Sequence, residues 1–237
     1  MRKLHPIALA VLALAFAVAP RAAPPPPAAK VTFLDGEASR SAGGKAEKLA
    51  LGTPLAEGDV VETQKRTRLE LSLADGSVVR MGPLSKARLE QAVFGKTPND
   101  RKVSARLLVG AVWANVAKAV GGDARFQVQT ENAVAGVRGT TFRVDAAHDK
   151  SVVVRVYSGT VAVAGGNLPR PEHHGAAEPR HQIQGPQEVT REQWERIVTT
   201  MMEVRVSAEG KAEEPQSFAL AEDDTWERWN RERDAAR

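Results

Sequence analysis

The sequence predicts an all-β domain that is followed by a linker and one or two C-terminal helices. Three observations predict this fold class. From Lys30 to about Gly166, apolar and polar residues alternate with the period of two that is typical of half-buried strands. Turn signals that contain glycine separate the alternating segments. Aromatic residues make up only 5% of the chain, so its core must consist mainly of Val, Leu and Ala, which suits closely stacked β layers better than a large ligand cavity.

The first segment is typical of a secretory signal peptide. Residues 1–3 form a short basic start, and residues 4–18, "LHPIALAVLALAFAV", are almost wholly apolar. This stretch is shorter than the roughly 20 residues needed to cross a bilayer, which disfavours an uncleaved membrane anchor. Residues 15–17 offer an A-x-A cleavage pattern, and residues 17–19 offer a poorer one. We therefore assign residues 1–19 to a signal peptide and expect export.

A proline-rich spacer, residues 20–29, precedes the domain, which we expect to span residues 30–166. The clearest hairpin signal is "RLELSLADGSVVRM", in which Leu alternates over residues 69–73 and an Asp-Gly pair at 75–76 supplies the turn. Further strands are expected at residues 31–34, 59–63, 105–116, 125–130, 141–145, 151–157 and 160–165. Eight or more short strands with glycine-marked turns imply an all-β domain.

One stretch within the domain is ambiguous. Residues 107–120, "LLVGAVWANVAKAV", contain enough apolar residues for a buried helix. Gly110 in the middle and the β-branched residues around it favour a strand pair.

The segment "AVAGVRGTTFRV", residues 133–144, has the composition of either an anion cradle or a sharp bend. An anion cradle needs backbone N–H groups at the start of a helix, whereas a strand pattern follows Gly139. We therefore expect Gly136 and Gly139 to permit a bend or a left-handed backbone conformation. We expect the Arg138 guanidinium to brace this corner by binding backbone carbonyls or a carboxylate such as Glu131.

Five segments in the same order resemble the FecR family domain, the periplasmic domain named after the ferric citrate regulator. They are "LALGTPLAEGDVVET", "TRLELSLADGSVVRMGP", "LLVGAVWANV", "FQVQTENAVAGVRGTTFRV" and "VVVRVYSGTVAV", and together they cover about residues 49–165. The family motif, to which we assign a structural role, comprises Gly136, Val137, Arg138, Gly139, Thr140, Phe142 and Val144. The resemblance implies a twisted, solenoid-like stack of strands rather than a closed barrel.

The resemblance also implies a setting in the cell envelope. Regulators of this family carry a cytoplasmic helical segment that handles a sigma factor, then one transmembrane helix, then the outer domain. This sequence shows neither a cytoplasmic segment of that kind nor a convincing membrane helix. We therefore expect the outer module alone, without direct control of a sigma factor.

Residues 167–188 are a linker by composition, rich in Pro and Gly. His173, His174 and His181 lie close together there, with Glu172 nearby. A flexible stretch lacks the fixed backbone that a metal site requires, so we expect no metal ion.

The tail, residues 189–237, shows a helical pattern. Thr190 and Gln193 match a capping box. The apolar face of this expected helix comprises Trp194, Ile197, Val198, Met201 and Met202. We expect this helix to pack on the β body or close one end of it, with partner binding as the alternative.

A second short helix is expected near the C-terminus, with Trp226 and Trp229 on one side. We favour docking of these rings against the body, with exposed recognition as the alternative. Both readings keep Trp194, Ile197, Met201, Trp226 and Trp229 as candidate partner-binding residues.

Charge and motif content narrow the function classes. Residues 30–166 carry 20 basic and 14 acidic groups, a net of +6, and residues 167–237 carry 10 and 15, a net of −5. The basic groups are scattered without interleaved aromatics, which disfavours nucleic acid. No nucleophile elbow, zinc-protease motif or phosphate loop is present, and there is no Cys, so we predict no catalytic residue, no cofactor and no enzyme.

The sequence therefore predicts a non-catalytic, exported binding or scaffold module in the bacterial periplasm or cell envelope. Its partner would be an envelope protein or a cell-wall polymer. One alternative is a periplasmic component of cell-surface signalling that reports to a separate membrane anti-sigma or receptor protein. Another is binding of cell-wall polysaccharide.

Overall fold

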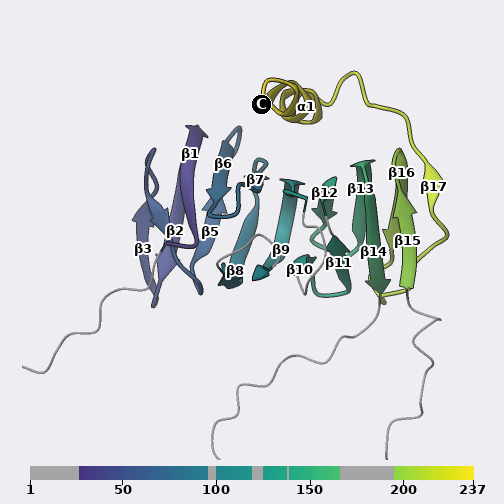
Figure 1. Cartoon of the computed structure of the whole chain (residues 1–237), viewed down its shortest axis with the longest axis horizontal. Helices are drawn as coiled ribbons and strands as arrows, with labels where there is room; N and C mark the ends of the chain where they lie inside the picture. The colour runs from purple at the N-terminus through teal and green to yellow at the C-terminus, as the bar shows by residue number, and fades with distance from the viewer. Residues whose placement is uncertain (1–26, 96–99, 119–124, 138, 166–194) are drawn as a thin grey trace, which may run out of the picture.

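The computed structural model describes residues 27–95, 100–118, 125–137, 139–165 and 195–237 (Figure 1). Within these ranges the chain is almost entirely β-structure and has one helix, α1 (Thr225–Ala235), so the predicted all-β class with a C-terminal helix is confirmed. The strands are β1 (Ala29–Asp35), β2 (Ala38–Ala42), β3 (Lys45–Lys48), β4 (Pro54–Leu55), β5 (Val60–Thr63), β6 (Arg68–Leu73), β7 (Val78–Met81), β8 (Lys86–Val93), β9 (Lys102–Asn115), β10 (Arg125–Gln129), β11 (Ala133–Val137), β12 (Thr141–Ala146), β13 (Val152–Ser158), β14 (Thr160–Gly165), β15 (Glu195–Thr199), β16 (Met202–Val206) and β17 (Gln216–Ser217).

The strands form two twisted layers that share β9. Sheet A has the order β1-β6-β7-β9-β12-β13-β16-β17, with β4 also paired to β1. Sheet B has the order β3-β2-β5-β8-β9-β10-β11-β14-β15. The chain crosses repeatedly from one sheet to the other as it advances along the long axis of the molecule (Figure 1). This is the twisted, solenoid-like winding that the family resemblance implies.

Strand β9 joins the two sheets by bending at Gly110. Its first part pairs with β8 and β10 in sheet B, and its second part pairs with β7 and β12 in sheet A. Gly110 has a φ of +95°, a value that favours glycine. A Cβ atom at this position would lie 2.3 Å from Ser85 Oγ and 2.5 Å from Ser85 Cα. The ambiguous stretch is therefore strand on both sides of a glycine corner.

The core lies between the sheets and is built from small and medium apolar side chains. In β12, Phe142 and Val144 are buried, whereas the alternate residues Arg143 and Asp145 are only partly buried. Phe142 of sheet A meets Phe126 of sheet B edge to face, with ring centroids 6.5 Å apart. An apolar cavity of only about 40 Å³ lies between the layers. The period-two pattern and the aromatic-poor composition thus produce a closely packed core.

The prediction of a helix over residues 190–202 is wrong for the part that the structure describes. Residues 195–206 form a hairpin, in which β15 extends sheet B beyond β14 and β16 extends sheet A beyond β13. Val198 is fully buried, whereas Ile197 is exposed, as alternation in a strand requires. The open edges of β13 and β14 offer backbone partners that a helix cannot use, and this tertiary pairing overrides the local helical pattern. Thr190 and Gln193 lie outside the described residues.

Helix α1 lies against the outer side of sheet A (Figure 1). Asp224 caps it by accepting hydrogen bonds from the backbone N–H groups of Trp226 and Glu227. No helix in the described ranges has the length and apolar character that a membrane span requires.

The bend in β9 gives a direct test of this fold. Gly110→Ala should lower the free energy of unfolding by about 3 kcal/mol or more, because the new methyl group meets the Ser85 backbone and the positive φ is strained. Gly44→Ala is the matched control, since Gly44 also has a positive φ, of +85°, but its Cβ would meet no atom within 4 Å. It should cost only about 1 kcal/mol. Urea unfolding measures both free energies, and an equal loss in the two variants would contradict the glycine corner at Gly110.

Candidate functional site

The outer face of sheet A carries a cross-strand row of large polar and aromatic side chains. The register of the strands places seven residues opposite one another in turn, and we call this set the sheet A row. Its members are Phe33, Glu70, Arg80, Trp113, Arg143, Arg155 and Glu203. They point outward because their sequence neighbours on either side fill the core, as Leu69 and Leu71 do around Glu70.

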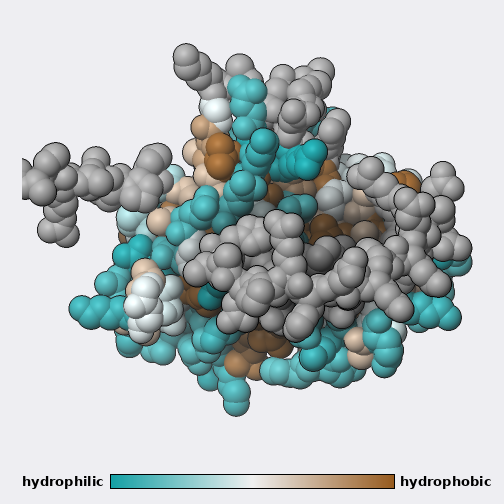
Figure 2. All heavy atoms as spheres, turned by 90° about the horizontal axis from the view of Figure 1, so that it is seen from below, coloured by the Kyte–Doolittle hydropathy of each residue, from teal (hydrophilic) through white to brown (hydrophobic). Residues whose placement is uncertain are grey.

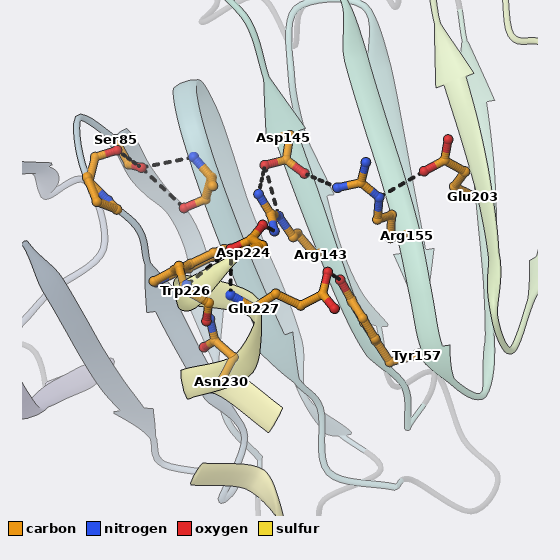
Figure 3. A network of polar contacts seen from close by, with 12 residues as sticks. Ser85, Arg143, Asp145, Arg155, Tyr157, Glu203, Asp224, Trp226, Glu227 and Asn230 are labelled. Atoms are coloured by element: carbon orange, nitrogen blue, oxygen red, sulfur yellow. Dashed lines mark hydrogen bonds and ion pairs between the residues drawn. The ribbon is translucent and has the colours of Figure 1, made fainter. Parts of the chain in front are cut away.

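Helix α1 packs on the part of this row from Phe33 to Arg143 and contributes charged and aromatic side chains to it. Figure 3 shows the part around Arg143. At one end Arg80 is fully buried and donates from Nε to Glu70 Oε2 at 2.7 Å. Arg80 Nη1 also lies 2.8 Å from Asp234 of α1. Arg233 of α1 donates to both carboxylate oxygens of Glu70, at 2.9 and 3.0 Å. Arg80, Glu70 and the last turn of α1 therefore form one buried ionic cluster.

The Glu70 carboxylate is held in its charged form. Burial opposes ionisation, but hydrogen bonds from Arg233, Arg80 and Thr32 outweigh it and lower the pKa of Glu70 from 4.5 to about 2. Thr32 Oγ1 donates to Glu70 Oε1 at 2.9 Å. A carboxylate with this pKa is suited to ion pairing and is poorly suited to proton transfer near neutral pH.

At the centre of the row, two aromatic residues, Trp113 and Tyr157, form hydrogen bonds to α1. Trp113 is fully buried and donates from Nε1 to Asp234 Oδ2 at 2.8 Å. Its ring packs on Tyr157, with centroids 4.2 Å apart. The Tyr157 hydroxyl donates to Glu227 Oε2 at 3.0 Å, and Glu227 is itself buried. Burial and the adjacent Glu227 charge both raise the pKa of Tyr157, so its hydroxyl stays a donor.

The first turn of α1 is fixed by Arg143. This side chain binds Asp145 from Nε at 2.9 Å and also pairs with Asp224, the N-cap of α1 (Figure 3). Burial of the guanidinium opposes its charge, but Asp145 and Asp224 outweigh this and raise the pKa of Arg143. Burial likewise opposes the charge of Asp224, yet the hydrogen bond from Arg143 and those from backbone N–H groups lower its pKa.

The row ends at Arg155 and Glu203 in the C-terminal part of sheet A. Arg155 Nε donates to Glu203 Oε2 at 2.8 Å, and Arg205 Nη2 donates to Glu203 Oε1 at 2.8 Å. Burial opposes the negative charge of Glu203, and the hydrogen bonds from Arg155 and Arg205 lower its pKa. The acidic tail thus neutralises arginines of the basic body within one chain.

Both tail tryptophans lie on sheet A. Trp226 is buried beneath Arg143, whose guanidinium carbon lies 5.0 Å from the ring centroid. A Cβ atom on Gly82 would come within 3.2 Å of the Trp226 ring, so glycine permits this close approach. Trp229 meets the ring of Phe33, with centroids 5.3 Å apart. The two rings therefore occupy adjacent parts of the same face.

The candidate partner-binding residues do not form one surface. Ile197 lies on the outer face of sheet B, and Met201 occupies the turn between β15 and β16 with a φ of +61°. Trp194 lies outside the described residues, as do the three linker histidines. Across the described ranges, no group of three or more His, Asp or Glu side chains is placed to hold a metal ion.

The family motif lies in β11 and β12. Val137, Phe142 and Val144 are core residues. The buried Thr140 donates from Oγ1 to the Thr160 carbonyl at 3.0 Å. These placements suit a structural role.

The glycines of the motif differ from each other. Gly139 has the left-handed φ expected of it, +70°, whereas Gly136 is an ordinary strand residue without a positive φ. Of the two alternatives expected for these glycines, a bend or a left-handed conformation, the left-handed one does not hold at Gly136, which pairs within β11 on both sides. Arg138 lies outside the described residues, so its bracing role stays a prediction. The Glu131 carboxylate pairs with Lys150 Nζ at 2.8 Å.

Sequence reasoning missed the sheet A row. Each member stands at an outward position of an alternating segment, so the direction of each side chain away from the core was predictable. The alignment of seven such positions depends on strand register across distant parts of the chain, which alternation alone does not specify. The sequence signal that could have indicated the row is the recurrence, in several predicted strands, of one large polar or aromatic residue between two apolar residues.

The architecture defines the chain as an all-β protein of two twisted layers with its own helix docked on one outer face. Residues 59–162 match the family model described as FecR protein. The chain therefore carries a FecR domain over these residues, as the sequence resemblance predicts.

Two solved structures are similar to this chain. Both are crystal structures of "a putative anti-sigma factor from Parabacteroides distasonis ATCC 8503", at 2.50 and 1.65 Å resolution. Their sequence identities to this chain are 18% and 19%, and the TM-scores are 0.46 and 0.45. Each match covers 67% of this chain and 59% of the solved chain. No curated protein gives a significant sequence match.

The Glu70 cluster predicts a defined pH dependence. Because the pKa of Glu70 is about 2 in the folded chain and 4.5 ordinarily, its ionised form stabilises the fold above about pH 4.5. That contribution disappears as the pH falls from about 4.5 towards 2. Glu70→Gln should therefore lower the free energy of unfolding by up to about 3 kcal/mol near pH 7, and the difference from wild type should shrink through that window.

Urea unfolding at a series of pH values measures this difference. Glu47→Gln is the matched control, because Glu47 is an exposed carboxylate that also pairs with an arginine, Arg40. It should change stability by less than about 1 kcal/mol. A Glu70→Gln loss that stays constant between about pH 7 and pH 3 would contradict the assigned charge state.

Proposed function

We propose that this chain is a non-catalytic protein-binding module of the bacterial cell envelope, and that the outer face of sheet A is its binding face. The observation that carries this proposal is the sheet A row, which already holds an amphipathic helix through specific contacts. The face recognises an acidic helix N-cap at Arg143, an indole ring above Gly82 and a carboxylate at Trp113. A partner would present a helix with the same features.

The residue types on this face support the proposal. Arg, Trp and Tyr are the residues that most often dominate binding energy at protein interfaces. Here Arg80, Trp113 and Arg143 stand opposite one another across the strands, and Tyr157 packs on Trp113. The pKa values of Glu70, Glu203 and Asp224 on this face are lowered, which suits ionic recognition rather than general acid–base catalysis.

The attachment of α1 also supports exchange with a partner. Phe218 N–H donates to the Met201 carbonyl at 3.2 Å, and no hydrogen bond then joins residues 219–223 to the sheets. Every hydrogen bond between α1 and sheet A involves a side chain. The helix can therefore leave the face without breaking a strand pairing.

Peptide binding in trans tests the binding face. A chain that ends at Ala221 should keep its sheets and should bind a synthetic peptide of residues 222–237 with micromolar affinity, because the peptide restores the contacts of α1. Fluorescence anisotropy of the labelled peptide measures this affinity. The full chain should bind the peptide far more weakly, since its own helix occupies the face.

A peptide with Asp224→Ala and Trp226→Ala is the matched control and should lose at least about tenfold in affinity. If the shortened chain does not fold, the full chain carrying these two substitutions serves as the receptor, because its sheets are complete and its helix is weakened. Absence of peptide binding to a folded receptor would contradict the proposal.

We infer further that the module acts outside the cytoplasm. The basic start, the apolar segment 4–18 and the A-x-A pattern at 15–17 support export. A periplasmic fraction that contains only chains retaining Met1 would count against cleavage.

The FecR domain match favours cell-surface signalling as the second candidate role. In that role the partner would be a membrane anti-sigma or receptor protein, and its recovery by cross-linking through sheet A is the test.

A further inference from the structure

The outer face of sheet B carries two unpaired cations side by side. Lys102 of β9 and Arg125 of β10 are directly opposite in the parallel register of these strands, and both are exposed. Like charges placed opposite each other destabilise a sheet. In the described part of the chain, no carboxylate pairs with either side chain.

The surrounding charges make this pair unusual. On the same face, Arg106 pairs with Glu90 and donates to Gln129, which in turn donates to Ser104 at 3.1 Å. The arginines of the sheet A row are likewise paired. The acidic tail therefore pairs with arginines of sheet A, whereas Lys102 and Arg125 have no counter-charge among the residues that the structure describes.

A hollow of about 180 Å³ lies at this pair. It is lined by Gln91, Lys102, Val103, Arg125 and Gln127. Gln91 and Gln127 both pair in register with Ser104, so their amide groups flank the cations on one face. The hollow is smaller than the roughly 300–1,000 Å³ of pockets that enclose a small molecule. It has the size to seat one unit of a longer polymer.

We propose that this hollow binds a carboxylate-bearing unit of an acidic polysaccharide. The planar Arg125 guanidinium matches a carboxylate, and Lys102 adds a compact positive charge beside it. The two glutamine amides supply donors and acceptors for sugar hydroxyls. No aromatic side chain lines the hollow, so it lacks the stacking surface that single-stranded nucleic acid uses.

The location suits an extended ligand. In Figure 2, which views the molecule from the side where β8 and β10 lie in Figure 1, hydrophilic residues lie around the rim of the visible face. This site is separate from the sheet A row, because β9 passes through the hollow before its bend at Gly110 and through the row only after it. Binding at sheet B therefore does not depend on the function proposed for sheet A.

Titration with a charged oligosaccharide tests the site. The probe is fluorescently labelled oligogalacturonate, and its methyl-esterified form, which has the same backbone without the charge, is the ligand control. The full chain should bind the acidic probe at least about tenfold more tightly than the ester, and added salt should weaken this binding. Inorganic polyphosphate is titrated in parallel to separate carboxylate recognition from general attraction to anions.

Two charge-reversal variants distinguish a loss of binding caused by the hollow from one caused by the change in net charge. Lys102→Glu with Arg125→Glu should weaken binding of the acidic probe at least about tenfold. Lys45→Glu with Lys48→Glu makes the same change of net charge on the exposed strand β3 and should alter affinity by less than about twofold. Lys102→Gln with Arg125→Gln should also lose binding, which keeps the test valid if charge reversal impairs folding.

Four outcomes would overturn the proposal. They are absence of binding to oligogalacturonate by the full chain, equal binding of the methyl ester, equal losses in the two charge-reversal variants, and tighter binding of polyphosphate than of oligogalacturonate. The last result would assign the hollow to a phosphate polymer instead.

Discussion

The buried guanidinium of Arg80 is the interaction on which the organisation of sheet A depends. A fully buried charge must be paired, because removing it from water costs far more than an isolated hydrogen bond returns. Glu70 supplies one partner from the neighbouring strand, and Asp234 supplies the other from the far end of the chain. Arg80 therefore connects the register of the strands to the docking of α1.

This arrangement separates the charges of the chain between two faces. Carboxylates of the acidic tail, such as Glu203, Asp224 and Asp234, neutralise arginines of sheet A. On the outer face of sheet B, Lys102 and Arg125 have no carboxylate partner among the described residues. We propose that one face suits an acidic, indole-bearing helix and the other an anionic polymer, so that the chain can join two such partners.

The predictable features of the chain are those that local pattern determines. The Asp-Gly pair at 75–76 does form the β6–β7 turn, and Gly139 is left-handed, because turn chemistry acts within a few residues. The prediction of a helix up to residue 202 is wrong because the helical spacing of its apolar residues is a local signal, whereas the available edges of β13 and β14 decide the outcome. The sheet A row needed the register of distant strands, which alternation does not encode.

Hydrogen exchange of the intact chain, followed by mass spectrometry, tests the central claim most directly. Because side chains alone hold α1 on sheet A, we predict that the amides of residues 225–235 exchange through local opening, faster than those of β12 and β13. Added salt should speed exchange in α1 more than in the sheets, since the partly exposed Arg233–Glu70 and Arg143–Asp224 pairs help to hold it. Equal protection of α1 and β12 at every salt concentration would show that helix and sheet unfold as one unit and would contradict the account.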